Sequence, residues 1–248
     1  MNPRALSALL PVLMSLPAFA ADPPAAKAPA TADAAFARFV EALGGEKAVR
    51  EQTTRQTKGR LSVPAMGLEG NIEMLQSAPR RTLQVIEVAP GMTLSMGSDG
   101  TVAWMTFPGI GAQEIEGEQR QNFIEDADIF RMLELPKRYS KSETKGSQKL
   151  DDVEVDLVVG TTPAGRTETL YFSRADGLLR RWDRQILTQA GSWEPGETWL
   201  EDYRAVDGIQ VPFKIRQPKP ESGAFEIVVS EVKHGVPAPA ERFRKPTE

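Results

Sequence analysis

Residues 92–107 read MTLSMGSDGTVAWMTF, and this stretch decides the fold. Every second residue from Met92 to Met96 is apolar, and Thr93, Ser95 and Gly97 occupy the intervening positions. This period of two is typical of a strand with one buried face. Asp99-Gly100 is a tight-turn signal, and the run from 101 to 107 continues with strand-forming residues. The stretch therefore predicts an antiparallel β-hairpin.

The same alternation recurs on both sides of this hairpin, with further Asp-Gly turns at Asp176-Gly177 and Asp207-Gly208. Twelve stretches carry the alternation, and together they predict roughly ten or eleven antiparallel strands; the stretches are 53–63, 68–75, 82–88, 92–97, 101–107, 139–146, 153–161, 167–173, 178–188, 197–203, 209–217 and 225–233. Because neighbouring strands twist against each other, so long a sheet must curl. We expect a mainly β (α+β) protein with a strongly curved sheet.

Two segments have helical spacing instead. Asp33 is a plausible N-cap for a helix with Phe36, Phe39 and Leu43 on one face, ending at Gly44-Gly45. Residues 114–135 carry acidic groups early and then apolar residues at helical spacing, which predicts a helical insert between strands. We expect these helices to cover the concave side of the sheet.

The N-terminal region has the features of an export signal. A basic start is followed by the apolar run 5–18 and the small-x-small motif Ala18-Phe19-Ala20, so residues 1–20 are predicted to be a cleavable signal peptide. Residues 21–32 (ADPPAAKAPATA) are predicted to be a flexible linker, and 33–248 a single domain. Because the chain has no cysteine, we expect no disulfide and no lipid anchor, and therefore a soluble periplasmic protein.

Composition excludes several classes of function. The formal charge is −4 and Lys and Arg are scattered, so no nucleic-acid footprint is present, and no run beyond the leader is long enough to span a membrane. A single histidine and no cysteine leave no ligand set of the usual zinc, copper or iron type. No nucleotide-binding loop is present either. We expect no cofactor, no metal and no catalytic residue.

Paired carboxylates leave one enzymatic alternative open. Glu125, Asp126 and Asp128 lie in the insert, while Glu197, Glu201 and Asp202 lie near Trp193 and Trp199. A glycoside hydrolase needs two carboxylates and sugar-stacking aromatic rings. Such clusters more often serve a helix dipole or a solvated strand face.

Methionine provides the positive signal for binding. Six methionines follow residue 20, and Met74, Met92, Met96 and Met105 lie on predicted strands. Flexible thioether side chains suit a surface that adapts to ligands of variable shape, although ordinary core packing explains them as well.

Three segments in this order resemble the outer-membrane lipoprotein-sorting (LolA-like) family. They are SDGTVAW at 98–104, TLYF at 169–172 followed by DGLL at 176–179, and YRAVDGIQVP at 203–212. The resemblance implies an incomplete antiparallel barrel, with helices over its open side and a hydrophobic cavity between them. It also implies transfer of acylated proteins or another lipid, with transfer complexes at the inner and outer membranes as partners. An arginine that links barrel and lid is a further implied feature, for which Arg60, Arg80 and Arg81 are candidates.

We therefore expect a soluble carrier of acyl chains. The residues expected to line its cavity are Ile72, Met74, Leu83, Val85, Met92, Leu94, Met96, Trp104, Phe123, Phe130, Trp199 and Phe213. The alternative from another class is a non-enzymatic protein–protein module for envelope sensing or assembly, which would have a filled core and a stable protein partner.

Overall fold

The computed structural model describes residues 29, 31–188, 191–220 and 223–247 of the 248-residue chain. The predicted signal peptide and most of the predicted linker lie outside these residues. Within the described part of the chain, no helix is long and apolar enough to cross a membrane.

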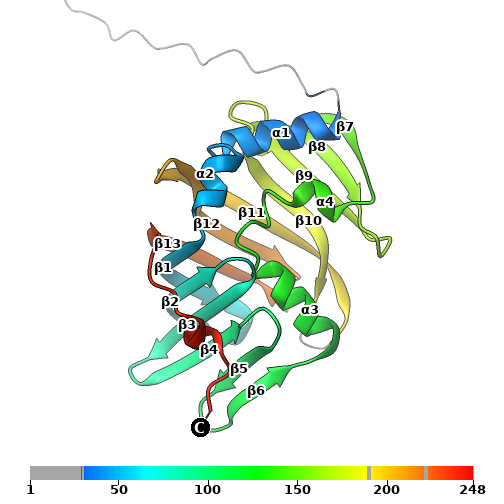
Figure 1. Ribbon diagram of the computed structural model, residues 1–248. Helices are drawn as coiled ribbons and strands as arrows, with labels where there is room; N and C mark the ends of the chain where they lie inside the picture. Colours follow the sequence, from blue (N-terminus) through cyan, green and yellow to red (C-terminus); the bar gives the residue numbers. More distant parts are fainter. Residues whose placement is uncertain (1–28, 30, 189–190, 221–222, 248) are drawn as a thin grey trace, which may run out of the picture.

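Thirteen strands form one antiparallel sheet that is strongly curved (Figure 1). The sheet consists of two meanders, joined where the first strand pairs with the last. The first meander contains β1 (Thr54–Val63), β2 (Leu68–Ser77), β3 (Arg81–Ala89), β4 (Met92–Ser98), β5 (Ala103–Phe107) and β6 (Gly111–Ile115). The second contains β7 (Lys141–Leu150), β8 (Val153–Thr161), β9 (Thr167–Ser173), β10 (Leu179–Leu187), β11 (Trp193–Val206), β12 (Ile209–Lys219) and β13 (Phe225–His234).

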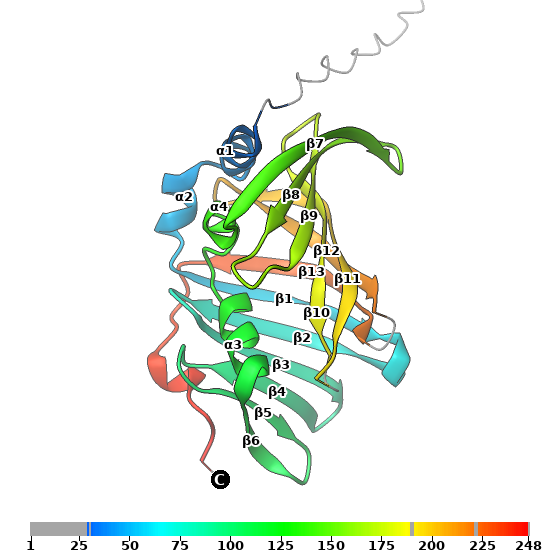
Figure 2. The same cartoon turned by 90° about the vertical axis from the view of Figure 1, so that its right-hand side faces the viewer.

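The two edge strands of this sheet, β6 and β7, are consecutive in the chain. Residues 116–140, which we call the connecting segment, therefore have to run from one edge of the sheet to the other. This segment contains α3 (Gly117–Asp126) and α4 (Leu135–Arg138). Figure 2 shows α3 and α4 on the same side of the sheet as α1 (Ala32–Ala42) and α2 (Glu46–Glu51).

The inner face of the sheet is apolar because alternate residues of neighbouring strands align across it. Residues directly opposite each other in an antiparallel pair share a face. One row on this face contains Val158, Leu170 and Trp182, and another contains Leu61, Leu200, Ile215 and Ile227. Phe36 and Phe39 of α1 pack on the first row, and Val49 of α2 lies between the two rows.

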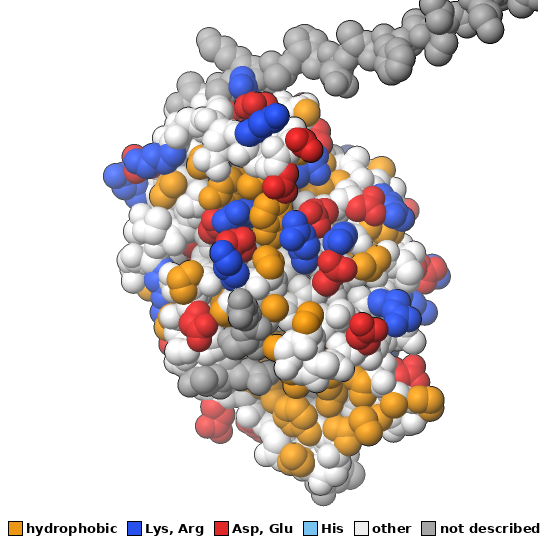
Figure 3. All heavy atoms as spheres, turned by 180° about the vertical axis from the view of Figure 1, so that it is seen from behind, with side chains coloured by type: hydrophobic (Ala, Val, Ile, Leu, Met, Phe, Trp, Pro, Cys, Tyr) orange, Lys and Arg blue, Asp and Glu red, His pale blue; other side chains and the backbone are white. Residues whose placement is uncertain are grey.

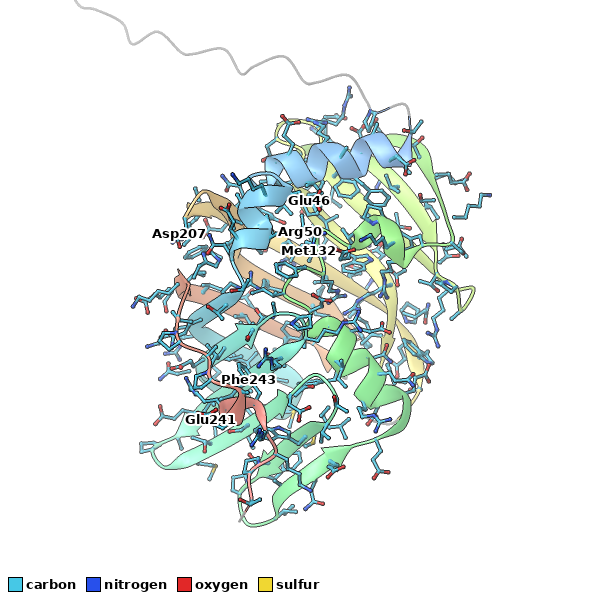
Figure 4. The ribbon with its side chains drawn as sticks, in the orientation of Figure 1. Glu46, Arg50, Met132, Asp207, Glu241 and Phe243 are labelled. Atoms are coloured by element: carbon cyan, nitrogen blue, oxygen red, sulfur yellow. The ribbon has the colours of Figure 1, made fainter. Side chains whose placement is uncertain are left out.

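A C-terminal segment covers part of the outer face. The short helix η3 (Ala240–Phe243) buries the Phe243 side chain completely, and the Arg81 guanidinium lies 5.9 Å from its ring centroid. The Trp104 indole Nε1–H donates a hydrogen bond of 3.0 Å to the Phe243 carbonyl oxygen. The position of η3 beside β3 and β4 is visible in Figure 4, where Glu241 and Phe243 are labelled.

The predicted fold class is confirmed, because the sheet is antiparallel, curved and not closed. The strand number is thirteen rather than ten or eleven. Each of the twelve predicted stretches overlaps a strand, and β6 is the strand that lies outside them; it reads GAQEI and follows a glycine-rich turn, which hides the alternation. The first helix begins one residue before Asp33, and its N-cap is Thr31, whose hydroxyl accepts a hydrogen bond of 3.2 Å from the Ala34 N–H.

Candidate functional site

A cleft of about 840 Å³ lies between the connecting segment and strands β9–β11, and the turns before β3 and β9 complete its walls. Its walls carry six basic and six acidic side chains together with a few apolar ones. The basic residues are Arg80, Arg131, Lys137, Arg138, Arg166 and Arg184, and the acidic residues are Glu118, Glu125, Asp126, Asp128, Glu134 and Glu168. Phe130, Ile186, Leu187 and Trp193 are the larger apolar residues in these walls.

Asp126 at the end of α3 holds two arginines across this cleft. Its carboxylate accepts hydrogen bonds of 3.3 and 3.1 Å from Arg184 of β10, and Arg131 lies 3.0 Å away. Burial alone would raise the pKa of Asp126, but the charges of Arg131 and Arg184 outweigh burial and lower this pKa well below its ordinary value. Burial lowers the pKa of Arg131 to about 10, so its guanidinium remains charged at neutral pH. One carboxylate thus joins the connecting segment to the sheet.

Glu168 of β9 anchors α4 beside the same cleft. Its carboxylate accepts hydrogen bonds from Arg138 at 2.7 Å, from the Tyr139 hydroxyl at 2.9 Å and from the Trp182 indole N–H at 2.9 Å. Burial would raise the pKa of Glu168, but the hydrogen bonds from Arg138 and Tyr139 lower it overall. Every oxygen of this buried carboxylate is therefore paired with a donor, as a buried charge requires.

Trp182 is surrounded by guanidinium groups at this site. The distances from its ring centroid to the guanidinium carbon Cζ are 4.5 Å for Arg131, 5.1 Å for Arg184 and 5.4 Å for Arg138. Cation–π attraction of this kind contributes about 0.5–2 kcal/mol per pair. The indole therefore contributes to the attachment of three of the five arginines that line the cleft.

Helix α3 is attached by polar contacts rather than by a core, since none of its residues is fully buried. At its N-terminal end Glu118 pairs with Arg166 at 2.9 Å and accepts a hydrogen bond of 3.3 Å from Trp193. At its other end it is held through Asp126. Exposed ion pairs contribute only about 0–1 kcal/mol each, so the Glu118–Arg166 pair holds the N-terminal end of α3 weakly.

Helix α2 supports the connecting segment from the other side. The Arg50 guanidinium donates a hydrogen bond of 2.8 Å to Glu134 and lies 5.6 Å from the Phe130 ring centroid. Figure 4 shows Arg50 next to Met132 of this segment.

The predicted lining residues divide between the two faces of the sheet. Ile72, Met74, Leu94, Met96 and Phe213 come together in one apolar cluster on the inner face. Met105 of β5 lies opposite Met96 of β4, and Met96 and Met74 of β2 both lie opposite Gln84 of β3. We call Met74, Met96 and Met105 the methionine row. Helix α3 contacts β5, the strand that contains Met105.

The other predicted residues lie elsewhere. Leu83 is aligned with Leu75 and Trp104 on the outer face, and Val85 shares that face. Trp199, paired with Arg181 and Arg216, also lies on the outer face. These four side chains therefore cannot line a hollow on the inner face. For Leu83 and Val85 the physical reason is that β3 is apolar on both faces, so its alternation does not indicate which face is inner.

Three predicted residues remain. Met92 is exposed at the start of β4, Phe123 is half-buried on α3, and Phe130 lines the cleft. Of the twelve predicted residues, Phe130 is the one found on the walls of this cleft as far as the structure describes them.

Of the three candidate arginines, Arg80 contacts the connecting segment. Its Nε donates a hydrogen bond of 3.1 Å to Asp128. Arg60 instead lies within 3.7 Å of Glu69 on the neighbouring strand, and Arg81 bonds to the Ala78 carbonyl and lies over Phe243. Two further links between the connecting segment and the sheet, through Arg138 and Arg184, were not predicted. The alternation RRWDR at 180–184, with arginines on both sides of a tryptophan, is the sequence signal that could have indicated them.

The two predicted carboxylate clusters do not meet. Asp126 and Asp128 pair with arginines on the inner side. Glu197 and Glu201 pair with Lys219 and Arg216 at distances of 3.0 and 2.9 Å, on the face that carries Trp199. In the described parts of the chain, no group of three or more His, Asp or Glu side chains could hold a metal ion.

Comparison with known proteins identifies the fold. No protein-family model matches the sequence, and no curated protein sequence matches it. Among solved structures, a DUF1329 family protein from Desulfovibrio piger aligns with a TM-score of 0.60 at 13% identity, over 86% of this chain and 96% of its own.

Two further structures carry the family name suggested by the sequence motifs. A LolA superfamily protein from Nitrosomonas europaea aligns with a TM-score of 0.54 at 15% identity, over 84% of this chain and 97% of its own. A putative outer membrane lipoprotein-sorting protein domain from Vibrio parahaemolyticus also gives 0.54, at 11% identity, over 82% and 97%. The expected LolA-like fold is confirmed.

Proposed function

We propose, with the LolA-like fold as the premise, that this protein is a periplasmic carrier of acyl chains, from lipoproteins or from another lipid. The observation that carries the proposal is the connecting segment, which crosses the open side of the sheet and leaves a cleft beneath it. The leader-like residues 1–20 support the location.

The acyl chain would lie between α3 and the methionine row. This part of the inner face is only partly buried at Met74, Leu94 and Met96, so it has apolar surface to offer. Methionine side chains adapt to chains of different length and branching. The charged cleft wall beside it, with Arg131 and Arg184, would remain in contact with water and the polar end of the ligand.

The energies suit a carrier. Burying a methylene group yields about 0.8 kcal/mol, so roughly ten of them give about 8 kcal/mol, or micromolar affinity before ordering costs. Such binding holds a lipid in transit and still permits release. Because α3 is held by ion pairs, its displacement would open the site at modest cost.

A direct test combines extraction and titration. Protein purified without detergent is extracted with organic solvent and analysed by mass spectrometry, and the stripped protein is titrated with dansyl-undecanoic acid. We expect lipid in the extract and a saturable rise in dansyl fluorescence. Leu94→Lys should weaken dansyl binding at least tenfold, whereas Val228→Lys, at an exposed position on β13, should leave it unchanged.

An extract without lipid, together with no dansyl binding by the native protein, would refute the carrier proposal. Equal binding by Leu94→Lys and the native protein would show that the methionine row is not the site.

One observation favours a second candidate, a protein–protein module for envelope sensing or assembly. The cleft walls are evenly charged with arginines and carboxylates, which suits a polar segment of another protein. This candidate predicts a stable protein partner in a pull-down that is lost in Arg184→Gln, with no lipid in the extract.

A further inference from the structure

Three turns at one end of the first meander expose large apolar side chains. They connect β1 to β2, β3 to β4 and β5 to β6, and they lie at the same end because alternate turns of an antiparallel meander do so. Their exposed residues are Met66 at 64%, Met92 at 48%, Phe107 at 40% and Ile110 at 64%. Figure 3 shows hydrophobic side chains gathered at the lower end of the molecule, where β3–β6 lie in Figure 1.

The composition of these turns separates them from the turns at the opposite end. They read VPAMGL at 63–68, VAPGMT at 88–93 and FPGIGA at 107–112, without a charged residue in any of them. The turns at the other end contain charged residues. Arg80 pairs with Asp128 of the connecting segment, and Asp99 accepts a hydrogen bond within its own turn, from the Thr101 N–H. Apolar exposure is thus confined to one end of the meander, where it serves no packing in the described structure.

The shape of this surface indicates what it contacts. Neighbouring strands lie about 4.8 Å apart, so successive turns on this end are roughly 10 Å apart, and the surface consists of separate tips instead of a groove. A stable protein interface buries about 800 Å² on each partner and includes polar pairs, which these tips do not provide. The region of a bilayer just below the headgroups, by contrast, accepts isolated apolar side chains, whereas charged side chains are costly there.

We propose that these three turns dock this protein on a phospholipid bilayer by inserting Met66, Met92, Phe107 and Ile110 below the headgroups. Met92 begins the strand whose next inward residues are Leu94 and Met96, so docking would bring the apolar inner face next to the membrane. The docking proposal does not rest on lipid binding by the inner face. Either property can be lost while the other persists.

The test uses phosphatidylcholine vesicles and the full chain. We expect the native protein to float with the vesicles, and the Met66→Ser/Phe107→Ser/Ile110→Ser variant to lose at least tenfold in partitioning. Val228→Ser removes a side chain of 47% exposure from strand β13 and should change partitioning less than twofold. Because the tips carry no charge, 0.5 M NaCl should not release the protein.

A second measurement reports insertion directly. Since the chain has no cysteine, single substitutions Ile110→Cys and Thr101→Cys can each carry an environment-sensitive NBD label. NBD fluorescence should rise on vesicle addition at position 110 and stay constant at exposed position 101, at the opposite end.

Three results would overturn the proposal. They are no flotation of the native protein, equal flotation of the triple variant, or a dimer in sedimentation velocity that the triple variant abolishes. The last result would assign the tips to a second copy of the chain.

Discussion

Replacing Asp126 by asparagine should loosen the link between α3 and β10. Asp126 accepts two hydrogen bonds from Arg184 and lies 3.0 Å from Arg131, so the change removes one carboxylate shared by two guanidinium groups. The guanidinium side chains are only 16% and 19% exposed, while the carboxylate is 40% exposed.

The magnitude lies between two limits. An exposed ion pair contributes about 0–1 kcal/mol, and breaking a fully buried one costs about 3–5 kcal/mol. For this half-buried group we expect a loss of about 2 kcal/mol in the free energy of unfolding. In a domain of this size that corresponds to a decrease of roughly 4–8 °C in Tm.

The assay is a double-mutant cycle at pH 7 with Asp126→Asn and Arg184→Gln, measured by guanidinium chloride unfolding. We expect a coupling energy of about 1 kcal/mol or more. Hydrogen exchange should accelerate in α3 and remain unchanged in α1, because α1 packs on its own apolar row.

The exposed pair Asp202–Arg204 is the matched control, since its side chains are half exposed and lie on β11. A coupling energy for Asp126–Arg184 no larger than that of the control pair would refute the idea that α3 is held by polar links.

Three further predictions test the packing around the site. Phe243→Ala should lower the free energy of unfolding by about 3–5 kcal/mol, because Phe243 is fully buried. It should leave dansyl binding unchanged, because Phe243 lies on the outer face. Weaker dansyl binding by this variant would contradict the assignment of Phe243 to that face. The pKa of Glu168 is lower in the folded state than its ordinary 4.5, so its stabilisation is present above this value and is lost as the pH falls below it. The free energy of unfolding of Glu168→Gln should therefore change less than that of the native protein between about pH 5 and 3, and parallel pH curves would count against this role. Gly160→Ala would place a methyl group 2.4 Å from the Tyr139 ring, so we expect a loss of about 1–3 kcal/mol, and a change below 0.5 kcal/mol would show that the ring can shift freely.

Periodicity was sufficient for the fold because the strands that carry it are amphipathic. In β4 the alternation from Met92 to Met96 gives both the strand and its inner face. In β3 both faces are apolar, since Leu83 and Ile86 point to opposite sides and each is covered. The outer cover is η3, which follows β3 by about 150 residues in the chain, so no local pattern could reveal it.

The cleft was harder to predict than the sheet. Its arginines come from β10, from the connecting segment and from the turns before β3 and β9, and their convergence depends on how that segment crosses the open side. The sequence indicated a helical insert but not that its two ends meet opposite edges of the sheet. Asp126 was singled out as a carboxylate, and its partner Arg184, 58 residues away, could not be paired with it without the topology.

The pairing of β1 with β13 sets the order in which the molecule can be completed. The two meanders are each local, but the seam between them joins Arg55 to His234, at nearly opposite ends of the folded region. A nascent chain cannot close this seam until its last strand is available, and contacts of such long sequence separation form slowly. Until then β1 remains an open edge, so a chain truncated before β13 should associate with other chains through that strand.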